Sequence, residues 1–170
     1  MYYSSRQKLQ KCQKRKKHGY KEQGESNTLT YIDDFAVIKE RVTIGENTII
    51  GAFNIIESGA KIGKNVTIQP HCVIARDSVI EDNVFIAPHF SCANDKRPSI
   101  GEHGQSSNKK PHKEFPIHIG EYSVIGTRCT VAPGIKIGKR CFIKMNCNIY
   151  DDVPDDTTVQ KNTTWSIDYD

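Results

Sequence analysis

Isoleucine recurs at every sixth position through most of the chain. The series begins at Ile32, runs without a gap to Ile86, resumes at Ile119 and ends at Ile149, with Val131 as its one exception. A helix of 3.6 residues per turn does not keep side chains six positions apart on one face, and simple alternation does not select every sixth residue. The pattern therefore predicts neither an ordinary helix nor an ordinary strand.

A second phase of mostly small or β-branched residues lies four positions after each isoleucine. Its members are Ala36, Val42, Thr48, Asn54, Ala60, Val66, Cys72, Ser78 and Val84, and later Ser123, Cys129, Ile135, Cys141 and Cys147. Glycine or alanine often follows the isoleucine directly, and polar pairs such as Glu46-Asn47 come next. The two phases together predict a short inward-facing β segment followed by a tight corner.

Three hexapeptides, one for each face, close a triangular coil, which makes the predicted fold all-β. Coils stacked at about 4.8 Å pair each β segment with the segments above and below, so backbone polar groups are satisfied without a flat open sheet. We expect a parallel β-helix of about six coils, the fourth of which carries an insertion. The coils are 32–49, 50–67, 68–85, 86–124, 125–142 and 143–160.

Charge divides the chain into three regions. Residues 1–21 hold eight lysines and arginines and no acid, whereas the other 149 residues hold 16 basic and 20 acidic groups. We expect a basic extension over 1–31, disordered or with a short helix over 5–17, a β-helix over 32–157 and a tail over 158–170. A basic extension can contact a polyanion, but one with few apolar residues is most simply solvated, so no nucleic-acid partner is expected.

No segment is apolar enough to predict a membrane span, and no signal peptide opens the sequence, which favours a cytoplasmic protein. A disulfide framework is not expected without a secretory signal, and the cysteines form no C-x-x-C pair. Four of the six cysteines fall in the small inward phase, and Cys92 falls in the isoleucine phase. We interpret these five as small apolar fillers of the core.

The hexapeptide rule breaks after FSCANDKRP (90–98). From phase counting, about 21 residues are inserted before Ile119, which places a loop over about 94–115. A β-helix can carry such a loop at a corner, and long loops of this kind tend to be functional.

The repeat resembles that of the hexapeptide-repeat acyltransferases. The motifs are IGENTI (44–49), IGKNVTI (62–68), IEDNVFIAP (80–88), IGEYSVIGTRCTVAPGIKIG (119–138) and VPDD (153–156), and the resemblance covers residues 32 to about 157. It implies a left-handed parallel β-helix, acetyl-CoA as co-substrate, and a homotrimer with active sites between subunits.

IEDNVFIAPHFSCANDKRP resembles the coil that carries a T-N-D-x-x-P loop in N-acetyltransferases of UDP- or dTDP-linked 3-amino sugars. Asn94 and Pro98 fall six and ten residues after Pro88, as in that group, while Ala93 replaces the usual threonine. The resemblance implies that Asn94 approaches the amine of the sugar.

The residue types suit this chemistry. Asn94 can align an amine for attack on a thioester, and Asp95 or His89 can take the proton. Lys96 and Arg97 can meet the diphosphate of a nucleotide sugar. The same residues are also typical of a plain exposed turn, and that alternative stays open.

Two histidines are spaced by one full coil. His71 and His89 each follow a proline, are expected to stack on one corner, and His71 is expected to line the substrate site. The insertion and the strand after it offer His103, His112 and His118 as further bases. Stacked histidines also occur in γ-type carbonic anhydrases, but the run that would supply their paired metal ligands, GTRCTVAPG (126–134), has no histidine, so no metal is expected.

We expect the acetyl-CoA contacts at Gly126, Thr127, Lys144 and Met145. The last coil departs from the family, because Lys144 and Met145 stand where glycine and alanine are usual, and Gly120-Glu121 replaces a lysine pair. Three functions therefore remain: an acetyl-CoA-dependent N-acetyltransferase on a nucleotide-linked amino sugar, a sugar O-acetyltransferase with a loop histidine as base, and a non-catalytic β-helix scaffold.

Overall fold

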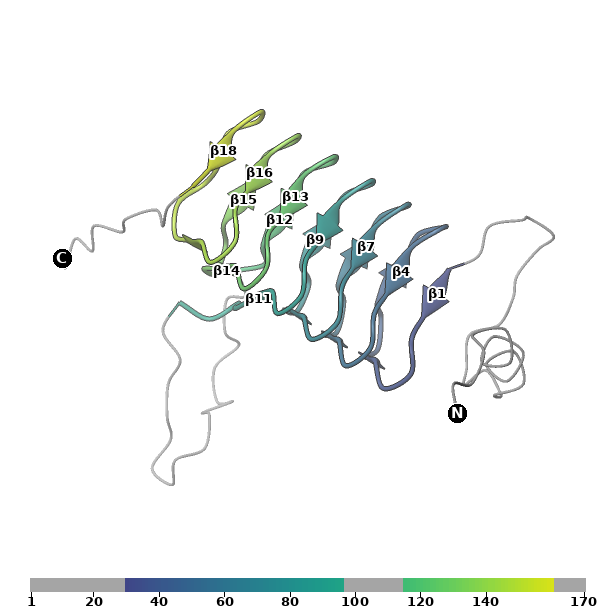
Figure 1. The fold of residues 1–170 in the computed structure, drawn as a ribbon. Helices are drawn as coiled ribbons and strands as arrows, with labels where there is room; N and C mark the ends of the chain where they lie inside the picture. The colour runs from purple at the N-terminus through teal and green to yellow at the C-terminus, as the bar shows by residue number, and fades with distance from the viewer. Residues whose placement is uncertain (1–29, 97–114, 161–170) are drawn as a thin grey trace, which may run out of the picture.

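The computed structural model describes residues 30–96 and 115–160, and all regular secondary structure within these two ranges is β. Two-residue strands stack into three parallel sheets, which form the faces of the coiled stack in Figure 1. The predicted all-β parallel β-helix of about six coils is confirmed. In these ranges no helix is long and apolar enough to cross a membrane.

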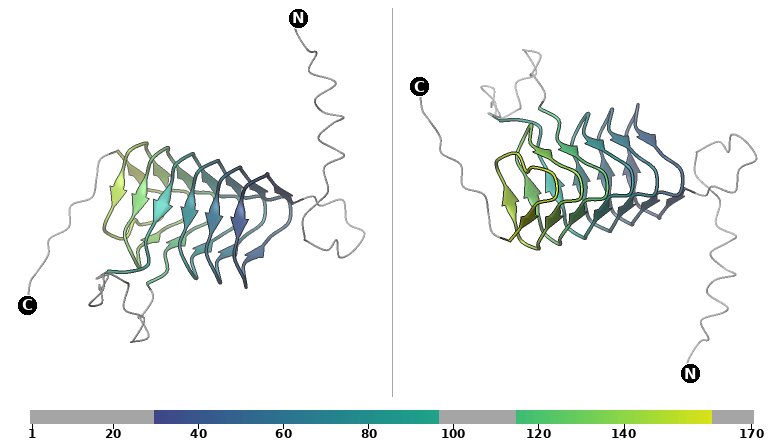
Figure 2. Two further views of the ribbon diagram at one scale, coloured as in Figure 1. Left: turned by 90° about the horizontal axis from the view of Figure 1, so that it is seen from below. Right: turned by 90° about the horizontal axis from the view of Figure 1, so that it is seen from above.

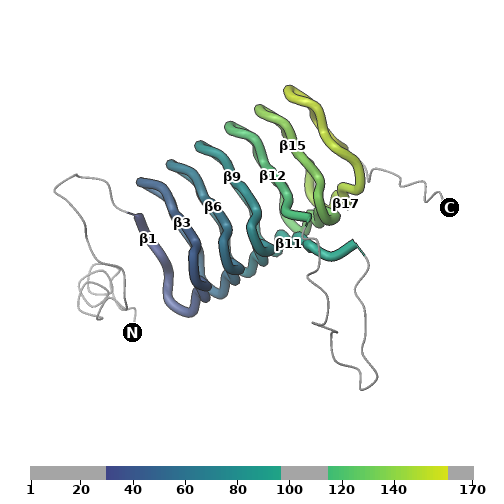
Figure 3. Tube along the Cα trace, turned by 180° about the vertical axis from the view of Figure 1, so that it is seen from behind, coloured from purple at the N-terminus to yellow at the C-terminus, as the bar shows by residue number. Residues whose placement is uncertain are grey.

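Each of the first five coils contributes one strand to each sheet, and Figure 2 shows the stack from two further sides. Sheet A contains β1 (Tyr31–Ile32), β4 (Ile49–Ile50), β7 (Thr67–Ile68), β10 (Phe85–Ile86), β13 (Val124–Ile125), β16 (Phe142–Ile143) and β18 (Thr158–Val159). Sheet B contains β2 (Val37–Ile38), β5 (Ile55–Ile56), β8 (Val73–Ile74), β11 (Ser91–Cys92), β14 (Thr130–Val131) and β17 (Asn148–Ile149). Sheet C contains β3 (Thr43–Ile44), β6 (Lys61–Ile62), β9 (Val79–Ile80), β12 (His118–Ile119) and β15 (Lys136–Ile137), seen from behind in Figure 3.

The second residue of each strand fills the core, as the sixfold period predicts. From Ile50 onward the isoleucines of this phase are at most 4% exposed. Ile32, Ile38 and Ile44 of the first coil are only partly buried, because no described residue lies beneath them. Isoleucine suits this place because a branched side chain fills the space between stacked strands and gains from leaving water.

The residues of the small phase lie at the corners of the coils, between one strand and the next. Three of its polar members are fully buried and bond to backbone: Thr48 donates to Gly63 O at 2.8 Å, Ser123 donates to Gly138 O at 2.8 Å, and Asn54 Oδ1 accepts from Cys72 N at 2.7 Å. Each therefore replaces a backbone bond that the corner cannot make.

The insertion leaves the stack without disturbing its register. Strand β11 pairs with β8 and β14, and β12 pairs with β9 and β15, with Ile119 opposite Ile80. The insertion therefore lies at the corner between sheets B and C. The larger part of the expected loop, residues 97–114, lies outside the described residues, as do the basic extension before residue 30 and the tail after residue 160.

The last coil is shorter than the expected three hexapeptides. Strand β18 pairs with β16 in a register that sets Thr158 opposite Phe142, whereas three full repeats would set Gln160 there. The difference arises on sheet C, where a single bridge between Ile137 and Val153 replaces a two-residue strand. Strand β18 also reaches Val159, which lies beyond the expected end at 157.

Candidate functional site

The two legs of the insertion meet at its base. Phe115 donates its backbone N–H to the carbonyl of Asn94 at 3.2 Å, and Gly134 of the next coil donates to the carbonyl of Phe115 at 2.8 Å. The ammonium of Lys96 lies over the Phe115 ring, 4.8 Å from its centroid. We call Asn94, Asp95, Lys96 and Phe115 the loop base.

Gly134 lets the loop base sit close to the coil above it. Its φ of +80° is in the left-handed region, and a Cβ added there would lie 3.2 Å from the Cβ of Phe115 and 3.7 Å from Cε of Lys96. A side chain at position 134 would therefore both strain the backbone and crowd the Phe115–Lys96 pair.

The loop base is polar and accessible. Asn94 and Asp95 are half-buried and Lys96 is exposed, so an amide, a carboxylate and an ammonium lie next to one another along the chain. This set can align a polar acceptor and attract an anion. Arg97, which was expected to join Lys96, lies outside the described residues.

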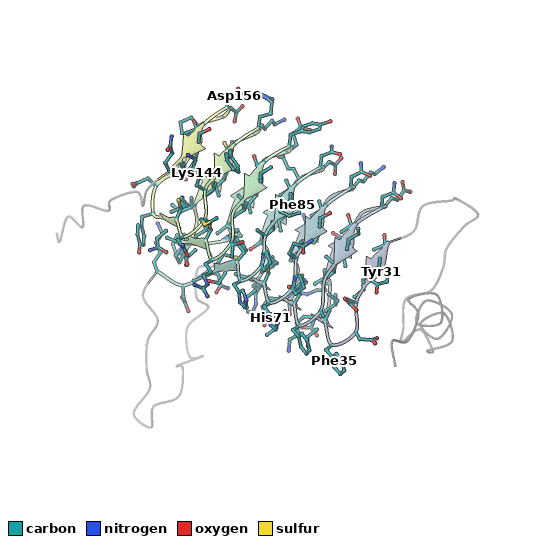
Figure 4. All side chains as sticks on the ribbon, in the orientation of Figure 1. Tyr31, Phe35, His71, Phe85, Lys144 and Asp156 are labelled. Carbon is teal, nitrogen blue, oxygen red and sulfur yellow. The ribbon has the colours of Figure 1, made fainter. Side chains whose placement is uncertain are left out.

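A column of stacked rings runs along the corner between sheets A and B. The rings of His71 and His89 have centroids 5.1 Å apart with planes 4° from parallel, as their spacing of one full coil predicts. Phe53 stacks on His71 at 5.1 Å, and Phe35 stacks on Phe53 at 5.3 Å. Figure 4 shows His71 and Phe35 along one edge of the stack.

The stacking of Phe35 and Phe53 in this column was not predicted. The signal was available, because positions 35, 53, 71 and 89 follow one another at intervals of one full coil. All four residues adopt a positive φ of 61° to 64°. This backbone lets the corner N–H reach the coil before it, as His71 N does to Ala52 O at 3.1 Å.

The expected cofactor residues gather farther along the same corner. Gly126 and Thr127 of the fifth coil lie beneath Lys144 and Met145 of the sixth, and Thr127 O accepts from Asn146 N at 2.9 Å. A Cβ on Gly126 would lie only 2.5 Å from Met145 N, so the close stacking of these two coils requires glycine there.

Lys144 and Met145 leave an exposed surface at this end. The ammonium of Lys144 donates to the neutral amide oxygen of Gln160 at 2.8 Å, so this contact does not neutralise its charge. Met145 is 67% exposed. A cation beside an exposed thioether can take a phosphate and an adjoining apolar chain.

The structure brings some predicted site residues together and separates others. His71, His89, Gly126, Thr127, Lys144 and Met145 share the A–B corner. Asn94, Asp95 and Lys96 lie at the B–C corner, on the other side of strand β11. His89 and Asn94 thus lie at opposite ends of one face, up to about 18 Å apart for five extended residues.

One histidine is fixed by a carboxylate. His118 Nε2 lies 2.7 Å from Oε1 of Glu81, and Oε2 of Glu81 accepts the backbone N–H of Glu121 at 3.0 Å. Partial burial acts to raise the pKa of the Glu81 carboxyl, but hydrogen bonds from His118 and Glu121 and the charges of His118 and Lys139 lower it below its ordinary value of 4.5. His118 was predicted as a candidate base, whereas its contact with Glu81 was not predicted.

The cysteines within residues 30–96 and 115–160 are buried free thiols, as their phase predicts. Burial raises the pKa of Cys72 to about 11 and that of Cys92 to about 11, which leaves little thiolate at neutral pH. All five described cysteines pack in the core. No group of three histidine, cysteine or acidic side chains in the described residues could hold a metal ion.

The repeat matches a known protein family. Residues 59–89 and 116–151 match the family described as bacterial transferase hexapeptide (six repeats). No curated protein matches the sequence.

Several solved structures share the fold. WeeI from Acinetobacter baumannii AYE is 26% identical with a TM-score of 0.62, covering 76% of this chain and 54% of that chain. A perosamine N-acetyltransferase mutant from Caulobacter crescentus, in complex with CoA and GDP-perosamine, is 20% identical with a TM-score of 0.64, covering 77% and 52%. The acetyltransferase domain of PglB from Neisseria gonorrhoeae FA1090, in complex with acetyl coenzyme A, is 19% identical with a TM-score of 0.62, covering 76% and 53%. The chain thus spans about half the length of these proteins.

Proposed function

We propose that this hexapeptide-repeat protein is an acetyl-CoA-dependent N-acetyltransferase acting on the amino group of a nucleotide-linked amino sugar, with UDP or dTDP as the nucleotide. The observation that carries the proposal is the loop base. It sets an amide, a carboxylate and an ammonium at the one described corner where the coil opens, and Phe115 fixes them there by a hydrogen bond and a ring contact.

Asn94 aligns the acceptor amine in this scheme. The amine nitrogen attacks the carbonyl carbon of the thioester, a C–N bond forms, and the C–S bond breaks. The proton lost by the amine goes to a base, and the departing CoA thiolate takes up a proton. Alignment of two bound reactants can supply much of such a rate. Asp95 beside Asn94 offers a carboxylate to hold the ammonium form before it loses its proton.

Lys96 binds the diphosphate of the nucleotide, with Arg97 as its expected neighbour. The Phe115 ring supports this role because it holds the flexible lysine side chain in one place without neutralising it. Acetyl-CoA lies along the A–B corner, where Lys144 meets a phosphate and Gly126, Thr127 and Met145 line the path of the pantetheine arm.

A homotrimer with active sites between subunits reconciles these two locations. Asn94 and the cofactor residues lie at different corners of one chain, so a second copy must bring the corners together. Exposed apolar side chains support such packing, because they cover sheet A, the A–B corner and the first coils of sheet B. They are Tyr31, Phe35, Val37, Ile49, Phe53, Ile55, Val73, Phe85, Val124 and Phe142. His71 and His89 would then line the groove formed with the neighbouring copy.

The fold neighbours agree with this chemistry. One of them holds acetyl coenzyme A, and another holds CoA together with GDP-perosamine, a nucleotide-linked sugar. They support acetyl-CoA as co-substrate and a nucleotide amino sugar as acceptor, and they make GDP a third nucleotide to test.

O-Acetylation of a sugar is a second candidate. Attack by a hydroxyl needs a base, and the His118–Glu81 pair is the arrangement that supplies one.

Acetyl-CoA binding comes first as a test. We expect calorimetric titration of the full chain to give a micromolar to millimolar Kd, and Lys144→Ala to weaken it, while Lys61→Ala, an exposed lysine on sheet C, leaves it unchanged. The absence of heat at millimolar acetyl-CoA would reject both transferase functions and leave the scaffold.

A further inference from the structure

Three histidines lie within the described residues, and only one of them is held as a general base requires. His71 and His89 make ring contacts within the aromatic column, and among the described residues neither has a carboxylate as a partner. His118 has one, because its Nε2 lies 2.7 Å from Oε1 of Glu81. A ring fixed by a carboxylate has one tautomer and one orientation, and these are the features that make an imidazole an efficient proton acceptor.

The contact between His118 and Glu81 uses only one of the two ring nitrogens of the histidine, Nε2. A carboxylate can only accept a hydrogen bond, so Nε2 of His118 carries a hydrogen, and in the neutral imidazole that acts as a base the lone pair is on Nδ1. The Glu81 carboxylate is itself fixed through its second oxygen by the N–H of Glu121 at 3.0 Å. The side chain of His118 is 37% exposed, so the ring is in part open to solvent while Nε2 is held by Glu81.

The position of His118 connects it to the loop base. Strand β12 begins three residues after Phe115, whose N–H bonds to Asn94 O. Three residues extend at most about 11 Å, whereas the five that separate His89 from Asn94 extend up to about 18 Å. Within one chain, the path from His118 to the carbonyl of Asn94, through Phe115 and its hydrogen bond, is therefore at most about 14 Å long, a smaller limit than that for His89.

Two lysines and one further acidic residue lie near the His118–Glu81 pair. Lys136 of β15 and Val79 of β9 flank His118 in the same outward column of sheet C. Lys139 lies 2.9 Å from Glu121 and pairs with it, which leaves Glu81 as the carboxylate that holds the histidine. The charged groups around this base are therefore the Glu81 carboxylate, the paired Lys139 and Glu121, and Lys136, and the described cysteines are all buried.

We propose that His118, oriented by Glu81, is the general base of the acyl transfer. This rests on the proposed function. The proton of the attacking amine or hydroxyl passes to Nδ1 as the bond to the carbonyl carbon forms and the C–S bond of acetyl-CoA breaks. The CoA thiolate then takes up a proton, which regenerates the neutral imidazole. Glu81 is a positioning residue, because it acts through His118.

The test compares full-length variants at saturating acetyl-CoA across pH 5 to 9. We expect His118→Gln, whose amide can still donate to Glu81, to lower kcat by about 10²-fold or more and to flatten its acidic limb. Glu81→Gln should lower kcat by about tenfold and shift that limb, a change that a purely structural role would not produce. Lys61→Gln, on the same sheet two coils away, is the matched control and should keep wild-type kcat.

Two readouts separate failure of this proposal from failure of the proposed function. Acetyl-CoA affinity should be unchanged in His118→Gln, and the imidazole nitrogen NMR spectrum of the wild type should show His118 with its hydrogen on Nε2. A wild-type protein that acetylates an acceptor while His118→Gln keeps its kcat within about twofold would overturn the base and leave the function intact. A large loss of kcat in His89→Asn and none in His118→Gln would overturn it in the same way.

Discussion

Asn94 and Phe115 are 21 positions apart in the sequence, yet the N–H of Phe115 lies 3.2 Å from the carbonyl of Asn94. This bond shuts the insertion at its base, so the coil above and the coil below keep their register. The polar residues next to it are therefore held by the β-helix itself.

Removal of the Asn94 side chain should cost turnover more than binding. If the amide aligns the amine, Asn94→Ala should lower kcat by about 10²-fold, because a small misplacement of two reactants has an effect of that size. Steady-state kinetics with an amino sugar nucleotide measure this. Asn65→Ala is the control, since Asn65 is a corner asparagine that bonds to Asn83 at 3.1 Å on another corner. Equal kcat in both variants would contradict the role of Asn94.

The ring of Phe115 should strengthen the binding of the nucleotide sugar by Lys96. Loss of the ring in Phe115→Ala frees Lys96, and an exposed cation–π contact corresponds to about a two- to fivefold change in affinity. We expect KM for the nucleotide sugar to rise by that factor while the Kd for acetyl-CoA stays the same. Phe115→Tyr keeps the ring and should restore KM; a KM that remains high in this variant would argue against the ring contact.

Glu81 should contribute stability that depends on pH. Its pKa is lower in the folded chain than its ordinary value of 4.5, since the bonds from His118 and Glu121 outweigh the effect of burial. A lowered pKa stabilises the fold above the unfolded value, and this contribution is lost as pH falls through the folded value. The difference in Tm between wild type and Glu81→Gln should therefore be largest above pH 4.5 and should shrink below it. A difference that grows toward acid would contradict this.

The aromatic column should stabilise the first coils. Phe35 and Phe53 stack at 5.3 Å with planes 5° apart, and such a pair is worth about 0.5–1.5 kcal/mol beyond the area it buries. A double-mutant cycle with Phe35→Leu and Phe53→Leu, read by urea unfolding, should give a coupling free energy of that size. Additive effects of the two substitutions would show that the rings stack without stabilising one another.

The fold was predictable because the six-residue period of isoleucine can be read directly from the sequence. Every sixth residue from Ile32 faces the core, and the small phase that accompanies it places Cys72 and Cys129 among the buried fillers. The shortened last coil was not predictable, since a single bridge at Val153 takes the place of a strand and the isoleucine phase gives no sign of it.

The candidate site was harder to predict than the fold. The spacing of His71 and His89 by one full coil predicted that their rings stack. The corner on which Asn94 lies could not be predicted in this way, because it depends on the position at which the insertion leaves the coil. The contact between Glu81 and His118 spans 37 positions, because the insertion separates these neighbouring coils by more than the usual three hexapeptides. Pairing of side chains across such a gap follows from the register of β9 and β12 and not from any local pattern.

The most direct test of the central claim is product analysis. The full chain would be incubated with acetyl-CoA and a panel of UDP-, dTDP- and GDP-linked amino sugars, and the products read by mass spectrometry before and after mild alkali. We predict an acetylated nucleotide sugar whose added mass survives alkali, as an amide does and an ester does not, with one CoA thiol released per acetyl group. An alkali-labile product would contradict N-acetylation in favour of O-acetylation, and no acetylated product or CoA release with any acceptor would contradict the claim as a whole.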